Sequence, residues 1–285
     1  SQANAVLEYL DTPRHAGCPT GLDELDEVLA GGIHPGGITL IGGDAKTGKT
    51  VLGLQVIRHA MHMPEPLPCL IVSRDQHRRD LAARIWSAEA GTPIPFLKGH
   101  ESAEKVIQLF ERWPLWYLQV DNREASAVCQ ALRVQIAQRG IRLWLLDHLQ
   151  MLTVKDADYN RAPVEAANML AWVAQDTNTY GMVISRFTKP VQGIAQQHRF
   201  AGEAGVQYAA DTMLVLHRLH DRTELNGGPR LVQVIGGRRC GDGSALLVLN
   251  GALHTFRCAD EEERAHWLPL FQRSRKEVAG VVSRA

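Results

Sequence analysis

The sequence lacks several features that would place it in a specialised class of protein. No apolar run is long enough to cross a bilayer, so a membrane-spanning helix is not expected. The five cysteines are scattered without a CxxC pair, which argues against a disulfide framework and a cysteine-based zinc site. The twelve histidines show no HExxH or comparable metal-binding spacing. We therefore expect reduced thiols and a cytoplasmic protein with no membrane partner.

The sequence also has no excess of charge of one sign. It contains 31 basic and 31 acidic residues, so any contact with nucleic acid has to come from local basic loops. No internal repeat or low-complexity tract is present. With 285 residues, of which 45% are hydrophobic, the chain is long enough to bury a large core.

The most specific feature is an octapeptide that matches the phosphate-binding P-loop pattern. Its glycines let the backbone turn so that several N–H groups converge on an anion, and Lys49 can reach the β- and γ-phosphates. The hydroxyl of Thr50 can hold Mg²⁺, and the following helix directs its positive end at the phosphates. We expect ATP and Mg²⁺ as cofactors, bound by Gly43, Asp44, Ala45, Lys46, Thr47, Gly48, Lys49 and Thr50.

The segments around the octapeptide support this interpretation. Residues 38–41 form a short β-rich apolar run, and residues 51–60 continue as a helix with an apolar face. Strand, loop and helix is the order that the motif requires. A glycine turn between two core elements is the alternative, and this order disfavours it.

Apolar runs and helical patterns alternate through the first two thirds of the chain. Beyond the P-loop, this part predicts strands at 70–73, 115–120, 143–147 and 182–185, with helices at 20–30, 80–90, 103–113, 125–139 and 163–176. Such alternation predicts a parallel α/β sheet with helices on both faces. The last third predicts an antiparallel extension of that sheet, with strands at 212–217, 230–235, 245–249 and 253–256.

No linker-like stretch divides the chain. We expect an arm or linker at 1–18, one nucleotide-binding domain at 19–258, and a tail at 259–285 that forms a helix or an arm.

Two acids are candidates for the rest of the nucleotide site. Asp147 ends the apolar strand 143–147, where the Mg²⁺-binding Walker B acid lies in such sheets; a surface acid that starts a turn is the alternative. Asp75 follows the strand 70–73 and can face the γ-phosphate from the carboxyl edge of the sheet. The alternative for Asp75 is a solvated acid among neighbouring arginines.

A pair of arginines follows the late strand 230–235, in the segment Gly-Arg-Arg-Cys-Gly at 237–241. A rigid guanidinium suits the charge of a phosphoryl-transfer transition state, and a basic hairpin turn is the alternative.

In this arrangement the chain resembles the DnaB-type replicative helicases, including the Twinkle and phage primase-helicase relatives, from about Thr20 to Phe256. These proteins share a RecA-like ATPase core. Residues 73–76 read Ser-Arg-Asp-Gln where the family has Ser-Leu-Glu-Met, and residues 147–151 read Asp-His-Leu-Gln-Met where it has Asp-Tyr-Leu-Gln-Leu. Residues 237–241 resemble its Lys-x-Arg-x-Gly finger segment.

The resemblance implies roles for three further residues. It implies that Asp75 activates water, that Arg186 occupies the position of the γ-phosphate sensor, and that Arg239 completes the site of a neighbour in a hexameric ring. Three residues depart from the family pattern: Asp75 replaces Glu, Arg186 replaces Gln, and Gly237 replaces the finger Lys.

The resemblance also implies single-stranded DNA as a partner, together with other replication proteins. The family contacts DNA through loops that correspond here to 153–163 and 188–205. Their basic residues are Lys155, Arg161, Lys189 and Arg199. Two ordinary surface loops are the alternative.

Three functions fit these features. The first is an ATP-hydrolysing DNA helicase that acts as a ring motor. The second, favoured by the three departures, is a RecA- or RadA-like ATPase that binds nucleotide and DNA for regulation or recombination without processive unwinding. The third is a loader or scaffold that uses ATP only to assemble.

Overall fold

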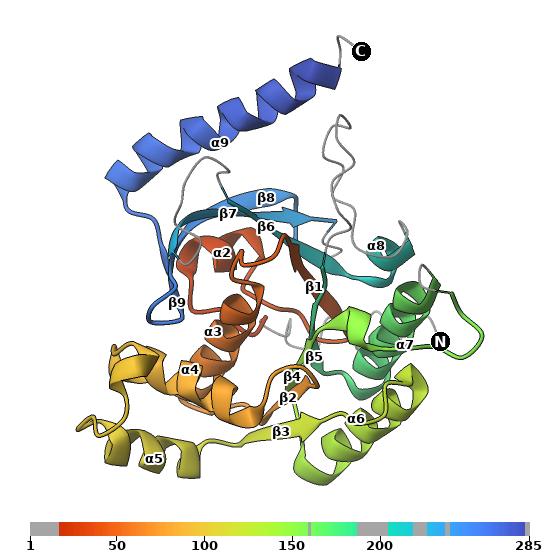
Figure 1. Cartoon of the computed structure of the whole chain (residues 1–285). Coiled ribbons are helices and arrows are strands. Elements are labelled where there is room, and N and C mark those ends of the chain that lie inside the picture. The colour runs from red at the N-terminus through yellow and green to blue at the C-terminus, as the bar shows by residue number, and fades with distance from the viewer. Residues whose placement is uncertain (1–16, 159–160, 187–204, 219–226, 237–239, 283–285) are drawn as a thin grey trace, which may run out of the picture.

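The computed structural model describes residues 17–158, 161–186, 205–218, 227–236 and 240–282, with backbone alone from 273 onward. The strands of these ranges form one sheet in the order β3-β2-β4-β5-β1-β6-β7-β8-β9 (Figure 1). Their bounds are β1 Gly37–Gly43, β2 Cys69–Ser73, β3 Leu115–Gln119, β4 Leu143–Asp147, β5 Tyr180–Ile184, β6 Thr212–Arg218, β7 Gly227–Ile235, β8 Gly243–Asn250 and β9 Thr255–Cys258.

Pairing divides this sheet into two parts. From β3 to β6, all neighbouring strands are parallel. From β6 to β9, all neighbouring strands are antiparallel. The predicted parallel α/β sheet with an antiparallel C-terminal extension is therefore confirmed.

Helices cover both faces of the parallel part (Figure 1). On one face, α3 and α4 bury Leu52 and Leu81, and on the other face α6 and α7 bury Leu132 and Leu170, while α2 packs against β8 of the antiparallel part. Every residue of β1, β2, β4 and β5 is buried, as expected for parallel strands covered on both sides. The helices are α2 Asp23–Val28, α3 Lys49–His62, α4 Arg78–Ala90, α5 Ala103–Arg112, α6 Ala125–Arg139, α7 Arg161–Thr177, α8 Gly205–Ala209 and α9 Glu261–Val282, with short 3₁₀ turns η1 Ile94–Phe96 and η2 Leu149–Met151.

Several expected boundaries differ from the observed ones by two or three residues: α2 begins at Asp23 rather than at 20, α4 at Arg78 rather than at 80, β5 at Tyr180 rather than at 182, and β8 at Gly243 rather than at 245. The last strand begins at Thr255 rather than at 253, because residues 251–254 form a turn in which His254 has a φ of 56°. The helix expected from 163 already includes Arg161, the first residue described after 158, whose backbone N–H donates to Asp158 Oδ1 at 2.8 Å.

The tail after β9 forms the helix α9, which leads away from the sheet toward the C-terminus (Figure 1). Its start is fixed by reciprocal capping, because Glu263 N donates to Asp260 Oδ1 at 2.8 Å and Asp260 N donates to Glu263 Oε2 at 3.1 Å. Phe271 is buried against Leu231 and Leu246 of the antiparallel strands. In the part of the chain that the structure describes, no helix is both long and apolar enough to span a membrane.

Candidate nucleotide-binding site

The loop 43–50 starts at the carboxyl edge of the parallel strands, where β1 ends at Gly43. In β4, Asp147 lies level with Ile184 of β5, and Ile184 lies level with Ile41 of β1. The P-loop and the acid therefore lie at the same edge of the sheet, with only β5 between their strands. This is the edge at which open α/β sheets bind their ligands.

Glycine is required at the start of the P-loop helix. Gly48 has a φ of +102°, a left-handed conformation that side chains rarely adopt, and it immediately precedes α3. A Cβ at this position would lie 2.8 Å from the ring of Phe256 and 3.3 Å from the side chain of Leu249. The antiparallel extension thus packs directly against the P-loop.

The ammonium group of Lys49 lies on the loop itself. Its Nζ donates to the carbonyl oxygens of Gly43 at 2.8 Å and Asp44 at 2.6 Å. Burial lowers the pKa of Lys49 to about 8, and the charges of Asp44 and Asp147 oppose this shift. The loop therefore holds a cation beside its backbone N–H groups, a combination that suits a polyphosphate.

Thr50 and Asp147, which are 97 residues apart in the sequence, meet directly. Thr50 Oγ1 donates to Asp147 Oδ2 at 2.8 Å. Burial raises the pKa of Asp147, and the hydrogen bond from Thr50 is the largest of the effects that oppose the rise. A hydroxyl and a carboxylate oxygen are hard donors of the kind that Mg²⁺ prefers, so the donor set fits this ion.

Two residues that the sequence did not point to complete this cluster. Gln76 Nε2 donates to Asp147 Oδ2 at 2.7 Å and to Thr50 Oγ1 at 3.4 Å. Arg84 of α4 in turn donates from a terminal nitrogen to Gln76 Oε1 at 2.9 Å. For Gln76, the signal in the sequence was an amide side chain at a position where the family has an apolar Met.

Asp75 lies at the edge of this cluster rather than inside it. Its side chain is 53% exposed, and His148 Nδ1 lies 3.7 Å from Asp75 Oδ2, an ion pair when His148 is protonated. Burial, and then the charge of Arg186, lower the pKa of His148. Arg186 is exposed and also lowers the pKa of Lys49, so its charge lies near the P-loop. Its backbone N–H donates to Gln150 Oε1 at 3.1 Å.

The family comparison fits this geometry. Residues 17–226 match the family model described as the DnaB-like helicase C terminal domain. The chain belongs to this family.

Relatives of this DnaB-like chain include both repair and replication proteins. The DNA repair protein RadA of Mycobacterium tuberculosis is 27% identical over 241 residues, 81% of this chain and 41% of that protein. The RadA of Mycolicibacterium smegmatis is 48% identical over 250 residues, 85% of this chain and 42% of that protein. The replicative DNA helicase DnaB of Leifsonia xyli subsp. xyli is 26% identical over 234 residues, 75% of this chain and 50% of that protein. The chain thus spans half or less of these relatives.

Solved structures show the same DnaB-like fold. A DnaB-like replicative helicase, reported with its interactions with primase, superposes with a TM-score of 0.74 at 13% identity over 91% of this chain and 66% of that chain. An isolated ATPase domain superposes with a TM-score of 0.74 at 14% identity over 91% of this chain and 97% of that chain. These likenesses establish the fold.

Arg230, in the antiparallel part of the sheet, also contacts the P-loop. Arg230 of β7 is 2% exposed, and its Nε donates to the carbonyl oxygen of Thr47 at 3.1 Å. Its Nη1 donates to the carbonyl oxygens of Gly227 and Pro229, each at 3.0 Å. This contact could not be predicted from the sequence, because a single arginine in an apolar strand matches no motif.

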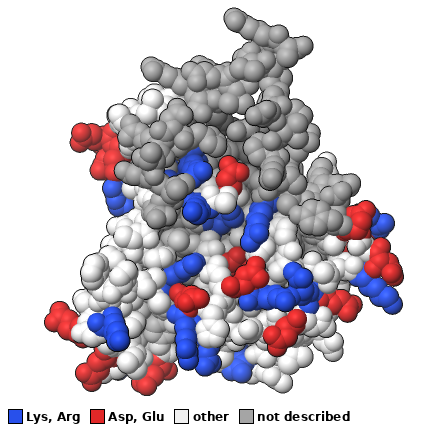
Figure 2. Space-filling view, viewed as in Figure 1, with Lys and Arg blue, Asp and Glu red and all other residues white. Residues whose placement is uncertain are grey.

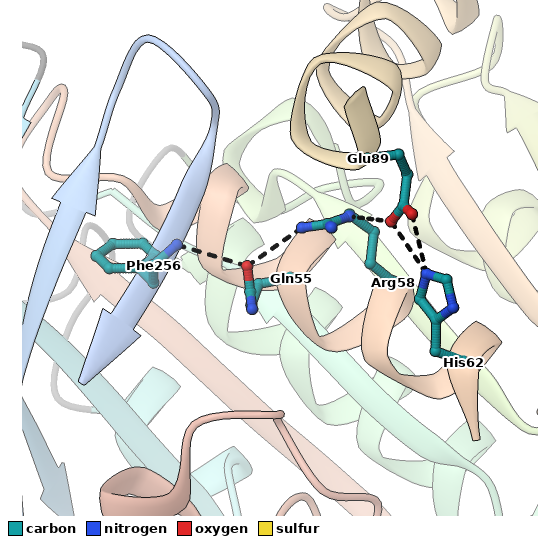
Figure 3. A network of polar contacts seen from close by, with 5 residues as sticks. All are labelled: Gln55, Arg58, His62, Glu89 and Phe256. Carbon is teal, nitrogen blue, oxygen red and sulfur yellow. Dashed lines mark hydrogen bonds and ion pairs between the residues drawn. The ribbon is translucent and has the colours of Figure 1, made fainter. Parts of the chain in front are cut away.

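The helix that follows the P-loop is tied to its neighbours by the polar network of Figure 3. Glu89 of α4 pairs with Arg58 Nε at 2.8 Å and with His62 Nε2 at 3.0 Å, both from α3. Gln55 Oε1, also in α3, accepts from the backbone N–H of Phe256 in β9 at 3.5 Å. These contacts join α3 to α4 and to the last strand.

A cavity of about 560 Å³ is lined by residues of β7, β8, β9 and the turn between β8 and β9. Leu249, one of its lining residues, also lies next to Gly48, and no residue of the P-loop is among the described residues that line it. Its volume is in the range of small-molecule sites. The other lining residues include Gly227, Gly228, Asn250, Thr255 and Arg257.

The remaining predicted residues are only partly described. Arg239, Lys189 and Arg199 lie outside the described residues. Lys155 is exposed in the turn after η2. Arg161 was expected in a loop but lies in α7, where it pairs with Glu165 at 3.0 Å. The loop placement was wrong because the helix already includes the residue whose N–H Asp158 accepts, while the DNA contact of Arg161 stays a prediction.

Proposed function

We propose that the chain is the ATP-driven motor domain of a DnaB-like helicase, which binds ATP with Mg²⁺, hydrolyses it and moves along single-stranded DNA. The observation that carries this proposal is the 2.8 Å hydrogen bond between Thr50 Oγ1 and Asp147 Oδ2, beside the loop that holds Lys49. These groups come from the two strands that P-loop enzymes use for phosphates and metal.

In this proposal the triphosphate binds along the backbone N–H groups of residues 43–50. Lys49 exchanges the two carbonyl oxygens that it contacts for oxygens of the β- and γ-phosphates. Thr50 and Asp147 hold Mg²⁺, which neutralises charge on the β- and γ-phosphoryl oxygens when it is bound.

Hydrolysis needs a group that orients the attacking water, and we assign this role to Asp75. Its 53% exposed side chain is open to water, and His148 lies 3.7 Å away as a partner for its carboxylate. Arg186, whose charge is close enough to Lys49 to lower its pKa, is assigned to the γ-phosphate.

We further propose a hexameric ring in which Arg239 acts on the site of a neighbour. Ile235, near the end of β7, lies level with Met213 of β6 and through it with Leu40 of β1. Gly43 at the P-loop lies level with Leu216, farther along β6. The end of β7, which precedes the segment with Arg239, therefore lies away from the P-loop of its own chain, and this supports the proposal of action in trans.

DNA is assigned to the basic residues Lys155, Arg161, Lys189 and Arg199. Over the described part of the face in Figure 2, basic and acidic side chains are interspersed, which favours binding through local loops over binding through one broad basic surface. The salt pair of Arg161 with Glu165 has to compete with a DNA phosphate. Other replication proteins are further partners in this proposal, and the five unbonded cysteines support a cytoplasmic location.

A second function is a RadA-like ATPase that binds DNA without processive unwinding. Its support is the 48% identity to a mycobacterial RadA together with the three departures from the helicase pattern. The two functions share the nucleotide site and differ in what hydrolysis drives.

The deciding experiment measures ATP turnover with and without single-stranded DNA, and strand displacement on a forked duplex in parallel. DNA-stimulated turnover with displacement is the result expected for the motor. Stimulated turnover without displacement supports the RadA-like alternative, and absence of turnover in folded protein contradicts both.

The ring is tested with Arg239→Ala. We expect nucleotide binding to remain while turnover falls by about a thousandfold, as for other arginine fingers. Mixing this variant with Lys49→Ala should restore part of the activity, because each chain supplies what the other lacks. No recovery in mixed oligomers would contradict action in trans.

A further inference from the structure

Gln76 bridges both groups that we assign to Mg²⁺. Its side-chain nitrogen lies 2.7 Å from Asp147 Oδ2 and 3.4 Å from Thr50 Oγ1. Asp147 Oδ2 therefore receives hydrogen bonds from Thr50 and from Gln76 at once. The neighbouring Asp75 makes neither contact and pairs with His148 instead.

The orientation of the Gln76 amide follows from the chemistry of its partners. Arg84 can only donate a hydrogen bond, so the amide oxygen has to face the guanidinium, where the distance is 2.9 Å. An ionised carboxylate can only accept, so the NH₂ group has to face Asp147. The two partners allow one orientation of the amide and exclude the flipped one.

The backbone of Gln76 is held as well. Its N–H donates to Ser73 Oγ at 3.3 Å, and its carbonyl oxygen accepts from the hydroxyl of Tyr117 at 2.5 Å. Ser73 ends β2 and Tyr117 lies in β3, so the residue is attached to two strands of the sheet. A side chain fixed at both ends can set the direction of a neighbouring carboxylate with little loss of conformational freedom.

We propose that Gln76, held by Arg84, is a positioning residue that directs the Asp147 carboxylate toward Thr50 and thereby sets the Mg²⁺ affinity of the bound nucleotide. The proposal rests on the nucleotide site proposed above and concerns its metal end. Outer-shell partners of this kind typically change metal affinity by about 10- to 100-fold when they are removed.

The test compares Gln76→Met with the unchanged chain, because Met has a similar length but cannot donate a hydrogen bond. Binding of a fluorescent ADP is titrated at a series of Mg²⁺ concentrations and in EDTA. We expect the half-saturating Mg²⁺ concentration to rise by about tenfold, while nucleotide affinity in EDTA stays the same. The matched control is Gln130→Met, on the exposed side of α6, which should change neither value.

Arg84→Met provides a second, independent variant. Because Arg84 acts partly through Gln76, we expect it to raise the half-saturating Mg²⁺ concentration in the same direction. The double variant should then be less affected than the two single effects combined, as for residues in one network. Thermal unfolding of each variant shows whether it is folded, and Arg84→Met carries the test if Gln76→Met does not fold.

Two results would overturn the inference and leave the nucleotide site intact. One is an unchanged Mg²⁺ requirement in folded Gln76→Met and Arg84→Met. The other is tighter Mg²⁺ binding, which would mean that the amide competes with the metal for Asp147. Failure of the unchanged chain to bind the fluorescent nucleotide would instead contradict the proposed function itself.

Discussion

The parallel and antiparallel parts of the sheet contact the P-loop in different ways. The parallel part supplies the groups that we assign to the nucleotide and its metal, with Lys49 and Thr50 after β1 and Asp147 at the end of β4. The antiparallel part supplies groups that pack against the loop. Arg230 donates a hydrogen bond to the carbonyl oxygen of Thr47, and the ring of Phe256 lies next to Gly48.

Substitutions in the two parts are therefore expected to have different consequences. The groups assigned to the nucleotide have charges or hydroxyls that the proposed reaction requires, so their replacement should abolish activity without unfolding the chain. Groups that support the loop are buried among protein atoms, so their replacement should lower stability and nucleotide affinity together.

In the parallel part, Lys49→Ala is expected to have the largest effect of all, on ATP turnover. Loss of this cation should lower turnover by at least about a hundredfold, because the developing phosphate charge loses a preorganised donor. The measurement is steady-state ATP hydrolysis, with thermal unfolding to show that the fold is kept. Lys98→Ala, at an exposed position, is the control. Wild-type hydrolysis by Lys49→Ala would contradict the assigned site.

In the antiparallel part, Arg230→Met is expected to lower both the stability of the fold and the nucleotide affinity. The change removes the donor to three carbonyl oxygens, and a buried unsatisfied acceptor costs about 1–3 kcal/mol. We expect a loss of a few kcal/mol in the free energy of unfolding and about a tenfold weaker nucleotide affinity, which corresponds to about 1.4 kcal/mol.

Chemical denaturation and nucleotide titration of the same preparation measure these two quantities. Arg133→Met, which breaks an exposed ion pair with Asp176, should change each by less than about 0.5 kcal/mol. An Arg230→Met variant that is folded and binds nucleotide normally would show that β7 does not support the loop.

A smaller effect is expected from Phe256→Leu in β9. Phe256 is 4% exposed and packs against Gly48, so the substitution leaves a gap on the far side of the loop. We expect about 1 kcal/mol of lost stability and a slight loss of nucleotide affinity. Denaturation and titration measure both, and an increase in affinity would contradict the supporting role.

The smallest effect concerns the attachment of α9 to the antiparallel part. Arg257 makes two hydrogen bonds of 2.6 Å to Glu263. These hydrogen bonds are the largest of the effects that lower the pKa of Glu263 to about 2. Because the folded-state pKa lies below the ordinary value of 4.5, the pair stabilises the fold above about pH 4.5. That contribution is lost as the pH falls toward 2.

For an exposed pair the difference should stay below about 1 kcal/mol. Glu263→Gln should therefore be slightly less stable than the unchanged chain at pH 7 and equally stable near pH 2, as measured by thermal unfolding. A difference that grows on acidification would contradict this account of the pair.

The same division explains which parts of the site the sequence could predict. Lys49, Thr50 and Asp147 were predictable because a local motif and the end of an apolar strand place them at one edge of the sheet. Gln76 and Arg84 were not, because their contacts depend on how the turn after β2 meets α4 and β4. Nothing local distinguishes this glutamine from a surface residue.

Arg230 shows the same limit at longer range, since its contact with Thr47 joins residues 183 apart in the sequence. Local backbone chemistry also changed predicted boundaries. The turn at His254 moved the last strand, and the contact of Arg161 with Asp158 places Arg161 in α7 rather than in a loop. Hydrophobic periodicity predicts that an element exists, whereas a single turn or capping residue decides where it begins.

The central claim is that loop 43–50 and Asp147 together bind a nucleoside triphosphate with Mg²⁺. Its most direct test is an equilibrium titration of the folded chain with fluorescent ATP in the presence of Mg²⁺. The account predicts saturable binding that weakens in EDTA and disappears in Lys49→Ala. Absence of saturable binding, or equal binding by Lys49→Ala, would contradict it.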